Sequence, residues 1–156
     1  MTAAVSNRLA ELGIVLPSPP TPTGSFELFV VHGLTVYLAG QTNEVAGVPT
    51  ASGRVPRDVS VEEGQAAARV CGLNLLAALA RACAGDLGRV QRCLQVRGFV
   101  NAQDGFDQIP AVINGASDLF VEVFGDAGRH ARTAVGVAAL PRNAAVEVDA
   151  IFVLRP

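Results

Sequence analysis

The chain has 156 residues, of which half are apolar and 17% are charged, with a formal net charge of −2 at pH 7. This length fits one domain that buries about two thirds of its unfolded surface. The acidic balance and the lack of any long basic run argue against nucleic acid as a partner. No apolar stretch reaches the roughly 18 residues that span a bilayer, and no signal peptide is recognisable. We therefore expect a cytoplasmic protein without membrane association.

The types of reactive side chain restrict the chemistry further. All twelve basic residues are arginines, so no lysine is present for a Schiff base or a phosphate-binding loop. Cys71, Cys83 and Cys93, with only two histidines beside them, lack metal-ligand spacing. We expect neither a metal nor a cofactor. The high apolar fraction favours an oligomer, because a monomer of this composition would expose apolar surface.

The N-terminal segment is predicted to differ from the rest of the chain. Residues 3–13 can form a short helix, and four prolines between positions 17 and 22 favour an extended linker. We therefore divide the chain into a helix and Pro-rich linker over residues 1–23 and an α+β domain over residues 24–156.

The domain is predicted to begin with a hairpin. Two apolar strands, Ser25–Val31 and Leu34–Ala39, are separated by His32-Gly33, a two-residue turn signal. The second strand ends at Gly40–Asn43, and residues 44–57, rich in glycine and proline, form a loop that can hold a short strand.

Two long helices follow. Ser60 and Glu63 form a capping box that opens a helix ending near Gly85. After a strand at Val90–Val100, apolar residues at helical spacing predict a second helix from about Asp107 to Gly125.

Two final strands, about 132–139 and 145–154, flank a turn at residues 140–143. This element order predicts an α+β fold with a single sheet and two long helices packed on one face.

Charged residues in the last two strands form the candidate site. Arg132 opens an otherwise small and apolar strand, and Glu147 and Asp149 lie in the other. A planar guanidinium binds a carboxylate through two parallel hydrogen bonds, and a carboxylate can deprotonate water. A structural ion pair between Arg132 and an acidic residue explains the same pattern.

These motifs resemble the reactive intermediate deaminase family, also called YjgF-like or L-PSP endoribonuclease-like, over about residues 24–154. The resemblance rests on the order and spacing of short segments: Ala39-Gly40-Gln41, Asn114, Ala131–Val135, Leu140-Pro141 and Val146–Ala150. The segments around Asn114–Asp118 and Gly128–His130 are typical of a longer, divergent branch.

The resemblance implies a chorismate-mutase-like fold that forms a homotrimer with clefts between subunits. It implies that Arg132 grips the carboxylate of a 2-imino or enamino acid while Glu147 positions the water that attacks the imine carbon. Ammonia and a 2-oxo acid are then released. It further places the backbone of Gly40 and Ala134, and the Asn114 side chain, beside this small carboxylated metabolite.

One position departs from the family pattern. Deaminase members commonly carry a tyrosine where this chain has Phe26, which keeps the ring but lacks the hydroxyl group. We therefore keep a second hypothesis, a non-catalytic protein that senses a small carboxylate in the same cleft. Ribonuclease activity is the least favoured, because the chain is acidic and has few aromatic residues for stacking on bases.

Strand register gives a separate expectation. If the last two strands pair across residues 140–143, Arg132 lies opposite Ile151, which is four residues and roughly 13 Å from Glu147. Within one subunit this distance is too great for one small ligand. A site that uses both residues is therefore expected to combine two chains.

Overall fold

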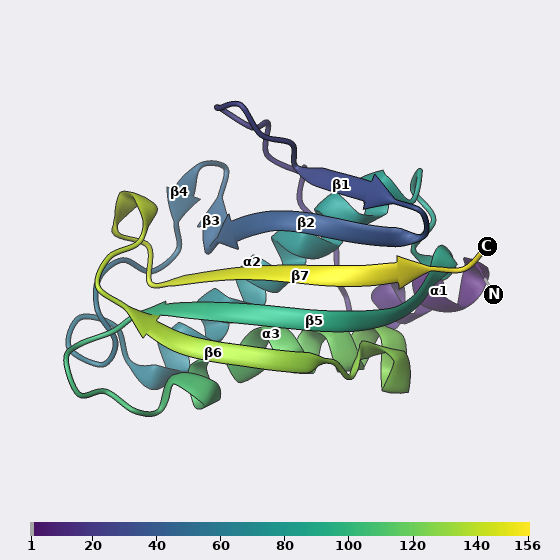
Figure 1. Cartoon of the computed structure of the whole chain (residues 1–156). Coiled ribbons are helices and arrows are strands. Elements are labelled where there is room, and N and C mark those ends of the chain that lie inside the picture. The colour runs from purple at the N-terminus through teal and green to yellow at the C-terminus, as the bar shows by residue number, and fades with distance from the viewer. Residues whose placement is uncertain (1) are drawn as a thin grey trace.

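The computed structural model describes residues 2–156 and has a five-stranded mixed sheet in the order β1-β2-β7-β5-β6. The strands of this sheet are β1 (Phe29–His32), β2 (Thr35–Thr42), β5 (Val90–Asn101), β6 (Ala131–Val137) and β7 (Val146–Leu154). Figure 1 shows α2 (Val61–Ala82) and α3 (Ile109–Phe124) together behind this sheet. The predicted α+β class, with both long helices on one face, is confirmed.

Shorter elements connect and flank this frame. They are α1 (Thr2–Glu11), the two-stranded ribbon of β3 (Glu44–Val45) and β4 (Val48–Pro49), and the 3-10 turns η1 (Leu87–Arg89), η2 (Gly125–Gly128) and η3 (Pro141–Asn143). The N-terminal helix packs against the domain, because Arg8 donates from Nε to the Glu122 carbonyl on α3 at 2.8 Å. The ribbon occupies the loop in which the sequence allowed a short strand.

A capping box begins α2, and glycines allow α2 and α3 to pack closely. Ser60 and Glu63 form the predicted capping box, with the Ser60 hydroxyl accepting from the Glu63 amide at 3.0 Å. Close approach of α2 and α3 depends on glycine. A Cβ at Gly115 would meet the backbone carbonyl of Gln65, and one at Gly72 would lie 2.8 Å from Leu119.

The core lies between these helices and the sheet. Phe120 on α3 meets Phe152 on β7 edge to face, with ring centroids 5.5 Å apart. Val148 and Ala150 alternate with the more exposed Glu147 and Asp149 along β7. One face of the strand is therefore packed on the helices, while the other carries the charged residues.

The hairpin turn is shifted by one residue from its predicted position. His32 pairs with Thr35, so the loop is Gly33-Leu34 and not His32-Gly33. Gly33 has a φ of +62°, and glycine adopts this conformation at low cost as the first loop residue.

The expected pairing of the last two strands is wrong. β5 lies between β6 and β7, running parallel to β6 and antiparallel to β7. The helix α3 connects β5 to β6, and such a crossover brings its two strands into parallel register. The last strand then enters beside β5 on the other side.

The face of the sheet away from the helices carries exposed apolar side chains. Tyr37 is 47% exposed and Val135 is 41% exposed there. Between them, Arg97 and Asp149 form a two-pronged ion pair, with Nη2 to Oδ2 at 2.8 Å and Nε to Oδ1 at 2.9 Å.

Candidate functional site

Glu147 lies in a cleft of about 490 Å³ at the end of the sheet where β2 meets β7. Its side chain is half-buried, and burial, with a smaller contribution from the Asp149 charge, raises the pKa of its carboxyl group. Within residues 2–156 no arginine or histidine forms a salt bridge with this carboxylate. Such a carboxylate is a stronger base than an ordinary glutamate.

Gly40 leaves room for this carboxylate. A Cβ at position 40 would collide with the Glu147 Oε1 atom. The register of β2 and β7 shifts between Leu38 and Gln41, so Gly40 lies in a local irregularity of the sheet. The two residues predicted from the motif are therefore in direct contact, and a larger side chain at position 40 would displace the carboxylate.

The N-terminal linker forms one wall of the same cleft. The wall consists of Pro20, Thr21, Pro22, Thr23 and Phe26. Phe26 is 57% exposed and precedes β1, so its ring stands at the cleft surface and not in the core. The segment that the sequence separated as a linker thus lines the same cleft as Glu147, which composition alone did not reveal.

Arg142 also lines the cleft. It donates from Nη1 to the Gly47 carbonyl and approaches Glu44 Oε2 at 3.6 Å. Its backbone φ is +54°, a left-handed conformation within η3. The guanidinium therefore bridges the β3–β4 ribbon and the turn before β7.

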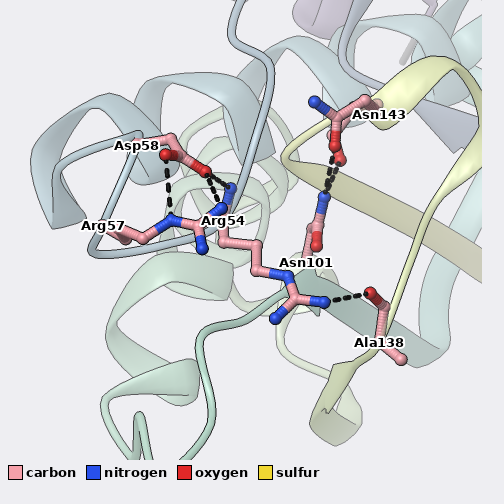
Figure 2. Close-up of polar contacts among 7 residues, drawn as sticks. Arg54, Arg57, Asp58, Asn101, Ala138 and Asn143 are labelled. Carbon is pink, nitrogen blue, oxygen red and sulfur yellow. Dashed lines mark hydrogen bonds and ion pairs between the residues drawn. The ribbon is translucent and has the colours of Figure 1, made fainter.

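Polar contacts hold this turn in place (Figure 2). Arg54 donates from Nη2 to the Ala138 carbonyl at 3.3 Å, and Asn101 donates from Nδ2 to Asn143 Oδ1 at 3.2 Å. Asp58 accepts from the Arg54 amide at 2.9 Å. The loop before α2 and the end of β5 together fix where β7 begins, and so where Glu147 lies.

Arg132 and Asn114 form a second group elsewhere. Arg132 donates from Nη1 to Asn114 Oδ1 at 2.7 Å and to Ser117 Oγ at 3.2 Å. Both partners are neutral, and within the described chain no carboxylate forms a salt bridge with Arg132. The alternative of an ion pair with an acidic residue is therefore not observed in the chain, and Asp149 pairs with Arg97 instead.

A shallow groove of about 230 Å³ runs beside this second group. Its lining includes Ser117, Asp118, His130 and Arg132. Ala134, the remaining predicted site residue, lies two positions after Arg132 on β6 and pairs with Gly98.

The two groups do not meet within one chain. Arg132 on β6 pairs with Val96 on β5, and Val96 pairs with Ala150 on β7. Glu147 lies three residues before Ala150 along β7. Three residues span about 10 Å, and two strand spacings add roughly another 10 Å across the sheet. Val96 and Ala150 face the helices, so alternation directs Glu147 to the opposite face from Arg132. One small ligand cannot contact both side chains of the same chain.

The remaining reactive groups offer little alternative chemistry. All three cysteines are buried, and desolvation raises the pKa of the Cys93 thiol to about 12. Among residues 2–156, no cluster of three or more histidine, cysteine or acidic side chains could hold a metal ion. In the same range, no helix is long and apolar enough to cross a membrane.

Comparison with known proteins decides the family. The family model described as "YjgF/chorismate_mutase-like, putative endoribonuclease" matches residues 6–153. The chain belongs to the YjgF family.

Proteins similar to this YjgF-family chain match nearly its whole length. Protein TCP17 of Trypanosoma cruzi is 44% identical, with 96% of this chain and 94% of that protein covered. A 2-iminobutanoate/2-iminopropanoate deaminase of Dermatophagoides farinae is 31% identical, with 90% and 94% covered. The crystal structure of protein Atu1372 from Agrobacterium tumefaciens is 40% identical, covers 98% of this chain and 93% of its own, and has a TM-score of 0.89.

Proposed function

We propose that the chain hydrolyses reactive 2-imino or enamino acids to 2-oxo acids and ammonia, at sites shared between the subunits of a homotrimer. The observation that carries this proposal is that two charged side chains, Arg132 and Glu147, are not paired with an opposite charge among residues 2–156. The guanidinium of Arg132 and the carboxylate of Glu147 have no oppositely charged partner among residues 2–156, and they lie on opposite faces of the sheet. Family membership and the similarity to a 2-iminobutanoate/2-iminopropanoate deaminase suggest the reaction that these two side chains would carry out, the hydrolysis of an imine.

Each group has a defined part in the reaction. The Arg132 guanidinium binds the substrate carboxylate, which holds the imine carbon in place. Glu147 accepts a proton from water as the water oxygen attacks that carbon, and the imine nitrogen becomes protonated. The resulting carbinolamine loses ammonia as its C–N bond breaks and the carbonyl forms. One water is consumed for each ammonia released, and no redox step is needed.

The homotrimer is part of the proposal, because it supplies the missing half of each site. A three-fold arrangement brings the Arg132 groove of one subunit toward the Glu147 cleft of its neighbour. The uncovered sheet face, with Tyr37 and Val135 exposed, provides apolar surface for that contact.

The test is ammonia release from a 2-imino acid generated in place by an amino-acid oxidase, measured above the spontaneous rate. We expect the native chain to accelerate release and Arg132→Lys to lose most of the effect. Lysine keeps the charge but not the two-pronged geometry, so affinity for the 2-oxo acid should fall by about 2 kcal/mol. Arg81→Lys, a matched change at an exposed position on α2, should retain the native rate.

The outcomes separate the two hypotheses. Calorimetric binding of a 2-oxo acid without any acceleration of imine hydrolysis would favour a carboxylate sensor, a role that the missing hydroxyl group of Phe26 supports. Unchanged binding of the 2-oxo acid by Arg132→Lys would show that Arg132 is structural and would remove the proposal.

A further inference from the structure

Two protein acceptors use one nitrogen of the Arg132 guanidinium. Nη1 donates to Asn114 Oδ1 at 2.7 Å and to Ser117 Oγ at 3.2 Å. A guanidinium has five N–H donors, two of them on Nη1. Both Nη1 hydrogens are therefore occupied, and the edge formed by Nε and Nη2 remains for a ligand.

Ser117 acts as an acceptor because its own proton is engaged by His130. The His130 Nδ1 atom lies 2.7 Å from the Gly128 carbonyl, which can only accept, so Nδ1 carries the ring proton. In the neutral ring Nε2 is then the acceptor, and it lies 2.9 Å from Ser117 Oγ. The hydroxyl donates to His130 and leaves its lone pairs facing Arg132.

The surroundings of His130 preserve this arrangement. Burial lowers the pKa of His130, and the nearby Arg132 charge acts in the same direction, while the hydrogen bond to the Gly128 carbonyl acts in the opposite direction. The lowered pKa keeps the ring neutral near pH 7. Phe120 meets the ring edge to face, with centroids 6.1 Å apart. The ring is therefore fixed by packing on one side and by two hydrogen bonds in its plane.

We propose that Ser117 and His130 are positioning residues that hold Nη1 of Arg132, so that the Nε–Nη2 edge presents a pre-formed fork to a substrate carboxylate. The inference rests on the proposed function for the identity of the ligand, but the hold on the guanidinium is a property of the free protein. Both residues act through Arg132.

The binding test compares Ser117→Ala, Ser117→Thr and His130→Phe, with 2-oxobutanoate as the calorimetric probe. Ser117→Ala should weaken binding about tenfold, the scale of one lost hydrogen bond to a charged group. Ser117→Thr keeps the hydroxyl and should restore most of the affinity. His130→Phe keeps a ring against Phe120 but removes the acceptor, so it should also weaken binding. Ser6→Ala, an exposed serine on α1, is the matched control and should bind as the native chain does.

A second measurement reads the guanidinium without any ligand. In nitrogen-15 spectra at low temperature, the two Nη groups of Arg132 should give separate signals in the native chain, because Nη1 is held. Arg132→Lys identifies those signals by their loss. Ser117→Ala should merge them through faster rotation, and Ser117→Thr should keep them apart.

These results distinguish failure of the inference from failure of the proposed function. If Ser117→Ala leaves both the signals and the 2-oxobutanoate affinity unchanged while its melting temperature is native, the positioning role is wrong. If the signals merge as expected but the native chain binds no 2-oxobutanoate, the hold on Arg132 is supported and the proposed function is overturned.

Discussion

At the scale of single residues, the proposed site combines the half-buried carboxylate of Glu147 with the guanidinium of Arg132, which donates to the neutral side chains of Asn114 and Ser117. Burial raises the pKa of Glu147, so the ionised form is disfavoured in the folded state. Stability from the protonated form is present below the ordinary glutamate pKa and is lost as pH rises through the raised folded value. At neutral pH the ionised carboxylate therefore reduces stability, an arrangement that is common where a group serves catalysis.

Glu147→Gln tests this view directly. The amide cannot accept a proton from water, so imine hydrolysis should slow about a hundredfold or more. The melting temperature at pH 7 should rise above that of the native chain, and the difference should shrink as pH falls through the raised folded pKa toward the ordinary glutamate value. Calorimetric melting from pH 4 to pH 8 measures both trends. Unfolding of the variant would instead identify Glu147 as a structural residue.

Phe26 tests how far the cleft has departed from the family pattern. If the missing hydroxyl group limits hydrolysis, Phe26→Tyr should raise the rate on 2-imino acids, because the exposed ring stays in place beside Glu147. If the cleft suits an apolar ligand, the added hydroxyl group lacks a partner and ligand affinity should fall by roughly 1–3 kcal/mol. A fall in affinity with no hydrolysis by either protein would favour the sensor hypothesis.

At the scale of elements, local signals predicted the parts better than their arrangement. Ser60 and Glu63 define the start of α2 through bonds three residues apart, so the sequence alone reveals them. The placement of β6 depends on the crossover through α3, and proximity in sequence wrongly suggested a pair with β7. For the same reason the motif identified Arg132 but not its hydrogen bond to Ser117, nor the bond between Ser117 and His130, which require α3 to lie beside β6.

The contact between α2 and α3 carries its own prediction. Alanine normally favours a helix over glycine by about 0.5–1 kcal/mol. At Gly115, however, the new methyl group would meet the Gln65 backbone carbonyl, which cannot rotate away. Gly115→Ala should therefore destabilise the chain by about 1–3 kcal/mol in urea unfolding. Gly64→Ala is the control across the same helix pair, since its methyl group would meet side chains and no backbone, with Val112 at 3.2 Å and Val55 at 3.6 Å. Equal stability of the two variants would contradict the close approach at Gly115.

At the scale of the whole molecule, Arg132 and Glu147 of one chain lie too far apart to bind the same small ligand. The sequence predicted that the two residues could not share a ligand within one chain, although it did so from a strand pairing that is wrong. The fold reaches the same separation differently, because β5 intervenes and the pleat directs the side chains to opposite faces. Under the proposed function each chain holds two half-sites, and sedimentation that shows a stable monomer at micromolar concentration would contradict shared catalysis.

Mixing two inactive variants provides the decisive experiment. Homotrimers of Arg132→Lys lack the Arg132 guanidinium in every subunit, and homotrimers of Glu147→Gln lack the Glu147 carboxylate in every subunit. If each site takes Arg132 from one subunit and Glu147 from its neighbour, co-refolded mixed trimers contain some sites with both native residues. When equal amounts assemble at random, the subunit that supplies the arginine has a native Arg132 in about half of the sites, and its neighbour has a native Glu147 in about half. About a quarter of the sites therefore contain both native residues. Deaminase activity should therefore recover to about that fraction.

The control mixes Arg132→Lys with the Arg132→Lys, Glu147→Gln double variant, which can form no native site and should stay inactive. If the first mixture also stays inactive although light scattering shows mixed trimers, the two residues do not share a site.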